Sequence, residues 1–213
     1  MTSTNITENI TNTGKTETKL NEVFVSIDIE ASGRRPDKNS IISIGYCIGG
    51  LDGKTISKDR ISLKPQEKSE FDKNTLNEFW SKQLDKLKIF QDESLDIIDG
   101  LKKFMKIVDD LEDKYKRVHI LCDNPAFDIH FIDYYLAKYL DRQPLSYTKN
   151  NKFRSIMTAH KYIFRTFGKF TYDKTKHEDE MKKYKINKDH YPENDAEYNY
   201  YYLISLINII GDK

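Results

Sequence analysis

The chain has 213 residues, long enough for one domain with a sizeable buried core. Hydrophobic residues make up 38% of it, and the 11 Phe and 14 Tyr predict an extensive folded region. The 35 Lys and Arg nearly balance the 34 Asp and Glu, which argues against a histone-like protein bound to nucleic acid by bulk charge. An enzyme that holds a few phosphates locally is not excluded.

Residues 1–20 are rich in Thr and Asn and offer almost nothing to a core. They have no basic start followed by an apolar stretch, so we expect no secretory signal and an intracellular protein, in the cytoplasm or the nucleus. This composition predicts a disordered polar tail, followed by a folded domain over residues 21–213. Cys47 and Cys122 lie in apolar runs and are expected to be buried, reduced thiols.

The folded part begins with three predicted strands. The runs VFVSIDIE (23–30) and NSIISIGYCIGG (39–50) are β-branched and apolar, and the turn SGRRPDK lies between them. Leu51-Asp52-Gly53 supplies a hairpin turn before KTISKDRISLKP (54–65), whose alternation predicts an edge strand. Apolar residues at three- and four-residue steps then predict helical stretches over about residues 76–87 and 98–111.

The second half begins with a buried-type strand, RVHILC (117–122), and a predicted helix over about 126–140. A further strand is predicted over 153–159, and residues 171–189 are expected to be charged and mostly irregular. An apolar helix over 196–210 is expected to be buried nearly all round. These elements predict a mixed-sheet α/β domain, in which sites collect at strand ends and at the helix starts that follow them.

Asp28 and Glu30 stand two positions apart at the end of the first apolar strand, so both side chains leave the same face of the sheet. Two like charges on an apolar strand repel each other and lose solvation. A divalent cation would reverse that penalty by giving both carboxylates a partner. A strand end that emerges into solvent would explain the same pattern.

Asp128 heads the apolar stripe of its own helix, which continues at i+3, i+4, i+7 and i+8. A carboxylate in the first turn gains from the helix dipole, and this alone would account for it. The direction of the side chain favours a functional role as well, because this aspartate faces the core side of the helix. Just after a buried strand, it is placed to reach the end of the sheet that carries Asp28 and Glu30.

His190 and Asp195 enclose the segment Tyr-Pro-Glu-Asn at the start of the last helix. Pro192 suits the first helical turn. Five residues along one helix turn about 140° away at 3.6 residues per turn, so the pair shares a site only if His190 lies on the preceding loop. A surface histidine and an ordinary helix-start acid are the alternatives when each residue is taken alone.

Taken in order, Asp-x-Glu, Asp128 and His-x4-Asp resemble the DEDDh branch of the RNase H-like 3′→5′ exonucleases, which includes proofreading exonuclease subunits, RNase T and oligoribonuclease. The similarity rests on the segments FVSIDIEASG, CDNPAFDIHFID and HYPENDA and spans about residues 22–205. Three motifs in order are far more specific than one. The resemblance implies an RNase H-like α/β fold, with a mixed five-stranded sheet flanked by helices in a single domain.

The resemblance also implies a metal site and a catalytic set. It implies two divalent cations, Mg²⁺ or Mn²⁺, with Asp28 bridging both. Glu30 and Asp195 would complete the first site, and Asp128 would bind largely through water. His190 would deprotonate or orient the attacking water, and the ordinary pKa of histidine, about 6.5, suits a base at neutral pH.

Substrate contacts are expected around these residues. Phe127, with Phe79 or Trp80, is placed to stack on the terminal base. Trp80 has a second interpretation, as a core residue of an amphipathic helix. Arg34, just past Glu30, is expected to touch phosphate or to lie in a solvated loop. Asn124 stands where many family members carry His-Asn, a departure that bears on substrate choice.

The expected partners are nucleic-acid 3′ ends, of RNA or single-stranded DNA, from which nucleoside 5′-monophosphates are released. No apolar run is long enough to span a membrane, and both a monomer and a homodimer remain open. One alternative is a catalytically idle nucleic-acid-binding module of the same fold, although all five motif residues are present. The other is a metal hydrolase of small nucleotides, which would turn over dinucleotides but not longer strands.

Overall fold

The computed structural model describes residues 20–145, 151–155, 174–186 and 188–211. Its strands form one mixed sheet in the order β3-β2-β1-β4-β5. β1 pairs antiparallel with β2, and β2 with β3, whereas β1 with β4 and β4 with β5 are parallel. The strands are β1 (Leu20–Ala31), β2 (Ile41–Gly49), β3 (Thr55–Ser62), β4 (Tyr115–Cys122) and β5 (Asn151–Ser155).

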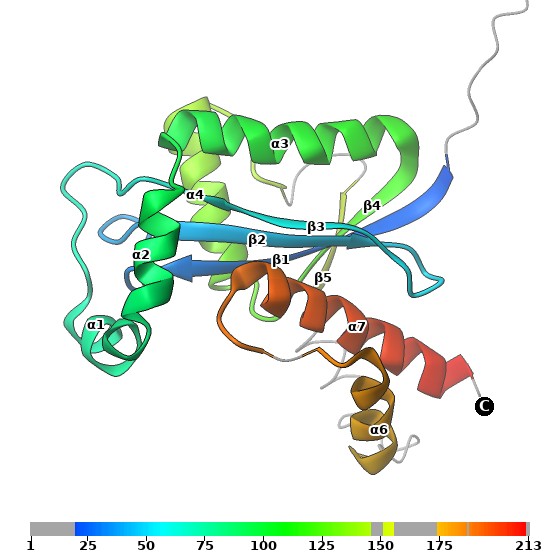
Figure 1. Ribbon diagram of the computed structural model, residues 1–213. Coiled ribbons are helices and arrows are strands. Elements are labelled where there is room, and N and C mark those ends of the chain that lie inside the picture. Colours follow the sequence, from blue (N-terminus) through cyan, green and yellow to red (C-terminus); the bar gives the residue numbers. More distant parts are fainter. Residues whose placement is uncertain (1–19, 146–150, 156–173, 187, 212–213) are drawn as a thin grey trace, which may run out of the picture.

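Helices cover both faces of this sheet (Figure 1). α3 and α4 lie on one face, α7 lies on the other with α6 beside it, and α1 and α2 stand at the end where β1 finishes. Among the described residues no helix is both long and apolar enough to cross a membrane. The helices are α1 (Lys73–Glu78), the short 3₁₀ turn η1 (Trp80–Lys82), α2 (Leu84–Asp92), α3 (Ile97–Lys114), α4 (Asp128–Leu140), α6 (Lys174–Tyr184) and α7 (Pro192–Gly211).

The alternation of side chains along β1 divides the core in two. Val25 and Ile27 belong to the larger cluster, which includes the buried residues of α3 and α4. Phe24 points the other way and packs with Ala196 and Tyr200 of α7. Because successive strand residues face opposite sides, the even-numbered positions of β1 face α7. The two acidic residues of the strand therefore share the α7 face.

Most of the predicted elements are confirmed. The mixed α/β sheet flanked by helices is present, and β3 lies at its edge after the turn at residues 51–53. Gly53 has φ of 74°, a left-handed conformation that glycine adopts without strain. β1 begins at Leu20, which pairs with Tyr115, so the sheet starts one residue before the predicted domain boundary. The predicted tail over 1–19 and the strand end at 156–159 lie outside the described residues.

Residues 171–189 were predicted to be mostly irregular, and this was wrong for Lys174–Tyr184, which form α6. Intrahelical ion pairs Lys182–Asp179 and Lys183–Glu180 offset the high charge of this segment, and Met181 is buried. The helical stretch predicted over 76–87 is broken into α1, η1 and α2. α6 is held by charge pairing and has no apolar periodicity to detect, whereas the periodicity over 76–87 does not reveal where the helix is interrupted.

α7 begins at Pro192, earlier than the 196 predicted, and its burial is one-sided. Ala196, Tyr200 and Ile204 are buried and recur every four residues, whereas Tyr201 and Tyr202 keep part of their surface exposed. The phenolic rings explain the difference, since a tyrosine buries its apolar body and keeps its hydroxyl near water.

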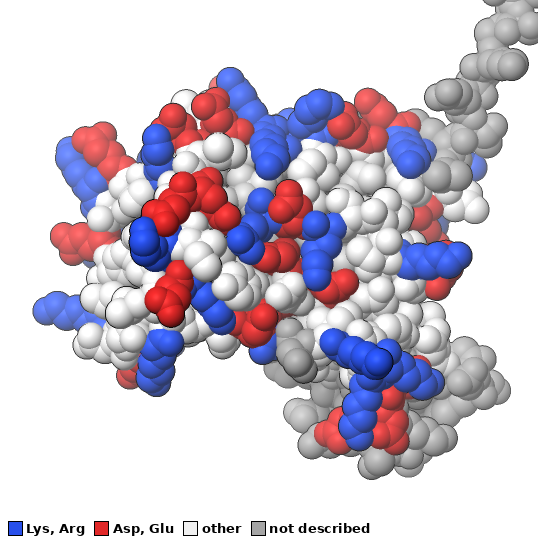
Figure 2. Space-filling view, in the orientation of Figure 1, with Lys and Arg blue, Asp and Glu red and all other residues white. Residues whose placement is uncertain are grey.

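The charged side chains of the visible face are interleaved in sign (Figure 2). Lys and Arg side chains lie among Asp and Glu side chains over this face, so it has no broad expanse of one charge. This agrees with the near-neutral total and places any attraction for phosphate at local clusters.

Candidate active site

Asp28 and Glu30 lie at the end of β1 and face the start of α7. Asp28 stands opposite Gly45 in the pairing with β2, and Glu30 opposite Ser43. Glu30 is buried, and Asp28 keeps part of its surface accessible. A Cβ on Gly45 would overlap the backbone of Pro192 at the head of α7, so this glycine allows the helix to rest directly on the sheet.

Asp128 reaches the same end of the sheet from the first turn of α4. It is buried, as the sequence predicts, and its Oδ1 accepts a hydrogen bond of 3.1 Å from the backbone N–H of Ile29. β4 runs parallel to β1, so the helix that follows β4 starts beside the end of β1. The inward direction indicated by its apolar stripe is thereby confirmed.

His190 lies on the loop before α7, as the five-residue spacing requires. Its φ of 60° is left-handed, which turns the chain sharply just before Pro192. The imidazole Nδ1 lies 3.8 Å from Glu30 Oε1 and 3.8 Å from Asp195 Oδ2. His190 is about half exposed, whereas Asp195 is buried. The structure therefore brings all three motifs together at one end of the sheet.

Burial raises the pKa of all four carboxylic acids. The pKa of Asp28 is raised well above its usual range, first by removal from water and then by the charges of Asp128, Glu30 and Asp195. The pKa of Glu30 is raised by the same loss of solvation, and Asp195 and Asp128 add to it. Burial also raises the pKa of Asp128 and of Asp195, against the hydrogen bonds that both carboxylates accept. The four acids repel one another in the arrangement that the fold imposes.

This donor set fits a divalent cation. Glu30, His190 and Asp195 offer ligand atoms that lie within 4.8 Å of one another. Lys188 lowers the pKa of Asp28 and Lys86 that of Glu30, but in both cases the raising effects are larger. A cation would offset the remaining repulsion, and carboxylate oxygens are the ligands that Mg²⁺ and Mn²⁺ favour.

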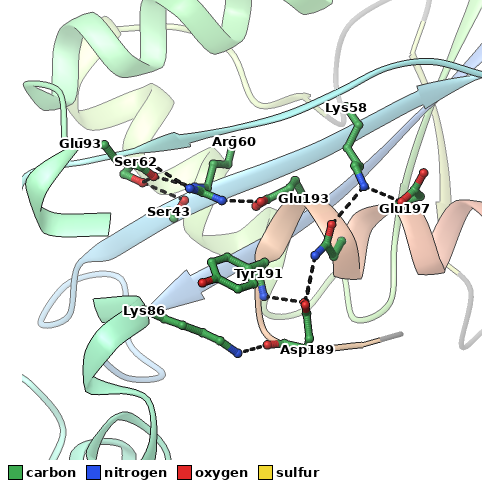
Figure 3. A network of polar contacts seen from close by, with 11 residues as sticks. Ser43, Lys58, Arg60, Ser62, Lys86, Glu93, Asp189, Tyr191, Glu193 and Glu197 are labelled. Carbon is green, nitrogen blue, oxygen red and sulfur yellow. Dashed lines mark hydrogen bonds and ion pairs between the residues drawn. The ribbon is translucent and has the colours of Figure 1, made fainter. Parts of the chain in front are cut away.

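Hydrogen bonds of Asp189 stabilise the loop before α7 that carries His190 (Figure 3). Its Oδ1 accepts hydrogen bonds from the backbone N–H of Tyr191 at 3.1 Å and from Asn194 Nδ2 at 3.2 Å. Its own backbone N–H donates to Asp195 Oδ1 at 3.0 Å, and its carbonyl accepts from Lys86 Nζ of α2. His190 is therefore flanked on both sides by backbone groups whose positions are fixed.

Arg60 of β3 joins this loop to the rest of the fold (Figure 3). Its guanidinium pairs with Glu193 in the first turn of α7 and, through Nε at 2.6 Å and Nη2 at 3.1 Å, with Glu93 at the end of α2. It also lies 5.3 Å from the centroid of the Tyr191 ring. One arginine thus links β3, α2 and α7 next to the acidic cluster.

A cleft of about 550 Å³ opens at this end of the sheet, and Glu30 is the site carboxylate that lines it. Phe79 and Phe127 both line it, and the Phe79 ring meets the His190 ring edge to face at 4.9 Å between centroids. Arg34 and Asn124 line it too, although the Asn124 side chain also accepts a hydrogen bond of 3.2 Å from the backbone N–H of Ala126. Four of the five predicted substrate contacts therefore border the cleft.

Trp80 is the exception. It is 1% exposed, and its indole N–H donates a hydrogen bond of 3.0 Å to the carbonyl of Ala31. Its ring meets those of Phe79 and Phe90 edge to face within the core. Its assignment as a base-stacking residue was wrong, because a ring enclosed in this way has no free face. The core interpretation of its helical spacing is the correct one.

Lys86 and Asp189 are among the residues of the site that motif reasoning misses. Asp189 directly precedes a motif residue, His190, and this adjacency is a weak sequence signal. Its hydrogen bonds, however, depend on the left-handed conformation of His190, which the residue types do not reveal. Lys86 comes from α2, far away in the sequence, and contacts the loop only once the chain has folded. Gly45, in the same way, looks like an ordinary strand residue in the sequence.

A family model described as a 3′-5′ exoribonuclease Rv2179c-like domain matches residues 23–206. The chain belongs to this family. The match contains all three acidic motifs, and the DEDDh-type 3′→5′ exonuclease family expected from them is thereby confirmed, as is the RNase H-like fold. The chain is also similar to an individual protein, the 3′-5′ DNA exonuclease Cap18 of Escherichia coli. The two are 33% identical over 123 residues, which cover 58% of this chain and 62% of Cap18.

Solved structures of exonuclease I share this family member's fold. The E. coli enzyme in complex with a 5cy-dA13 oligonucleotide superposes with a TM-score of 0.63 at 12% identity, over 88% of this chain and 40% of that one. The zinc-bound form of the E. coli complex with single-stranded DNA gives 0.60 at 14% identity, over 90% and 41%. The chain thus spans less than two thirds of the length of the relatives that it matches.

Proposed function

We propose that this protein is a metal-dependent 3′→5′ exonuclease that removes terminal nucleotides from RNA or single-stranded DNA as nucleoside 5′-monophosphates. One observation carries the proposal. Asp28 and Glu30, Asp128, and the His190–Asp195 pair are far apart in the sequence and converge at one end of the sheet beside an open cleft. Packing does not require four mutually repelling acids at one place, whereas phosphodiester chemistry makes use of them.

Asp28, Glu30, Asp128 and Asp195 would hold two divalent cations, Mg²⁺ or Mn²⁺. When bound, such ions neutralise the charge that develops on the phosphoryl oxygens and on the leaving 3′ oxygen. The protein contributes rigidity, because the backbone N–H groups of Ile29 and Asp189 fix Asp128 and Asp195 through hydrogen bonds. Carboxylates fixed in this way need no reorganisation during the reaction.

His190 is the proposed general base. It is about half exposed, lies beside Glu30 and Asp195, and borders solvent from which a water molecule can enter. The water oxygen attacks the phosphorus of the terminal phosphodiester, and its proton passes to the imidazole. The bond from phosphorus to the 3′ oxygen of the preceding nucleotide breaks, and that oxygen takes up a proton from solvent water. The products are a strand with a new 3′-hydroxyl and a nucleoside 5′-monophosphate.

Phe79 and Phe127 are the proposed contacts of the terminal base. Both line the cleft next to the carboxylates, and aromatic stacking tolerates every base because each has a π face. The family is described as an exoribonuclease domain, whereas the 33% identical relative is called a DNA exonuclease. Both nucleic acids are therefore proposed substrates.

Product identity tests this function. Wild-type protein with Mg²⁺ or Mn²⁺ and an unlabelled oligonucleotide is expected to release nucleoside 5′-monophosphates, identified by chromatography and mass. The 3′-terminal base should appear first in the time course. Release of 3′-monophosphates, or of the 5′-terminal base first, would overturn the proposal. Binding of the strand without any product would identify the idle module instead.

A further inference from the structure

A second groove, of about 650 Å³, lies next to the cleft. Arg34 lines both hollows, so they adjoin at this residue. The groove is formed by two loops, residues 32–40 after β1 and residues 64–73 before and into α1, which we call the two-loop platform. This platform stands at the end of the sheet where β1 finishes, and Lys and Arg side chains project from that end among the acids (Figures 1 and 2).

The platform is held together by buried polar groups that the proposed chemistry does not use. Gln66 is 4% exposed, and its Nε2 donates to the carbonyls of Pro36 at 2.9 Å and Asn39 at 2.6 Å. Asn39 Nδ2 donates to the carbonyl of Glu70 at 2.8 Å, and Ser40 Oγ donates to Ser69 Oγ at 2.6 Å. These buried hydrogen bonds hold the two loops against each other. The backbone positions from which the groove side chains project are therefore fixed.

The groove has more positive than negative side chains. Its lining contains five cationic side chains and three acidic ones. Two of the acids are already engaged: Asp37 accepts bonds from Arg35, and Asp72 caps α1 by accepting from the N–H of Thr75 at 2.9 Å. The cationic lining residues are Arg34, Arg35, Lys38, Lys68 and Lys73, of which Arg34, Lys38 and Lys73 form no ion pair with a described residue.

We propose that the two-loop platform binds the phosphate backbone of the substrate strand upstream of the nucleotide being removed. The inference rests on the proposed function, because a 3′ end seated in the cleft can continue only in the 5′ direction. Lys38 and Lys73 contact successive phosphates, and Arg34 spans the junction between cleft and groove. The substrate class is accordingly a strand of several nucleotides, and a dinucleotide is too short to reach the lysines.

Equilibrium binding in EDTA tests the platform, because it does not require turnover. Fluorescence anisotropy is measured with single-stranded 20-mers of RNA and of DNA over a range of salt concentrations. The variant is Lys38→Ala/Lys73→Ala, and the matched control is Lys102→Ala/Lys106→Ala, which removes the same charge from the exposed side of α3. Both lysine pairs are exposed, so neither change opens the core.

The platform variant is expected to bind the 20-mers several-fold more weakly than wild type. The slope of log K against log salt should fall by about 0.7 for each phosphate that the variant no longer neutralises. The control should match wild type, and with Mn²⁺ both variants should turn over a dinucleotide at the wild-type rate. Unchanged 20-mer binding and salt slope in the platform variant would overturn the inference, as would equal weakening in the control. Those results would not bear on the proposed nuclease activity. An inactive wild type whose strand binding still depends on the platform would overturn the proposed function and the upstream direction of the strand, but not the binding of phosphate by the platform.

Discussion

His190 and Asp195 illustrate how single residues determine this site. On a continuous helix the two side chains would diverge, but the left-handed φ of His190 places the imidazole on a loop that returns toward Glu30. A non-glycine residue keeps a left-handed φ only where neighbouring contacts hold it there. Here Asp189 provides such contacts, because its carboxylate accepts hydrogen bonds from the N–H of Tyr191 and from Asn194. The geometry of the base therefore depends on Asp189, which is not among the residues that line the cleft.

His190→Ala separates proton transfer from metal binding. A positioned acid–base group contributes about 10²–10⁴-fold, so kcat should fall by roughly that factor while Mn²⁺ binding by calorimetry is retained. Asp28→Asn should lose more activity and fail the calorimetric assay, because Asp28 is expected to contact both ions. Full activity in His190→Ala would remove the histidine from the mechanism. Loss of Mn²⁺ in that variant would instead make His190 a ligand, consistent with its place beside Glu30 and Asp195.

Asp189→Ala should lower kcat about tenfold or more, with little change in KM or in Mn²⁺ affinity, because the loop loses its fixed geometry. Asp189→Asn keeps an oxygen acceptor for the N–H of Tyr191 and should recover much of that loss. Asp52→Ala is the matched control, since Asp52 makes the same bond to the N–H two residues on, at 3.2 Å to Lys54 in the β2–β3 hairpin. Equal kcat losses in Asp189→Ala and Asp52→Ala would contradict a positioning role.

Among the elements, the direct contact between α7 and β2 decides whether Asp195 lies close to Asp28 and Glu30. Gly45→Ala places a Cβ against the backbone of Pro192 and Glu193, which cannot move aside as a flexible side chain can. The head of α7 must therefore shift, and we expect a lower Tm together with a large loss of kcat. Gly50→Ala is the control, because its nearest neighbour is the movable carboxylate of Asp52. Wild-type activity in Gly45→Ala would show that α7 tolerates displacement.

The strands and the acidic motifs could be predicted from the sequence because each leaves a local signal. Alternation assigns Asp28 and Glu30 to one face, and the apolar stripe of α4 indicates the inward direction of Asp128. Elements held by contacts remote in sequence escape this reasoning. α6 has no apolar periodicity, and Trp80 is buried although its spacing suits either role. The bond from Lys86 to the Asp189 carbonyl exists only after folding.

For the whole molecule, the acidic cluster couples stability to pH and to metal. The folded-state pKa values of Asp28 and Glu30 lie above the ordinary values of about 4, so their contribution to stability is present at lower pH and is lost as pH rises through the folded pKa. Metal-free protein should therefore melt at a lower temperature at pH 8 than at pH 5.5, and Mn²⁺ should reverse much of that decrease by mass action.

Asp28→Asn isolates this contribution. It removes one of the four repelling charges, so in EDTA its Tm should exceed that of wild type by about 2–4 °C for each kcal/mol of repulsion relieved. Its pH dependence should be shallower, and the gain from Mn²⁺ should be small. Thermal scans in EDTA and in Mn²⁺ at several pH values measure all three effects. Superimposable curves for wild type and variant would mean that the acids are not strained in the metal-free fold.

The most direct test of the central claim is the degradation of a 5′-end-labelled single strand, resolved to single nucleotides. With Mn²⁺, wild-type protein should shorten both an RNA and a DNA 20-mer one nucleotide at a time from the 3′ end and produce a continuous ladder. EDTA should abolish the ladder, and so should Asp28→Asn. Internal cuts without a ladder, or a ladder that persists in EDTA or in Asp28→Asn, would contradict a metal-dependent 3′→5′ exonuclease built on these residues.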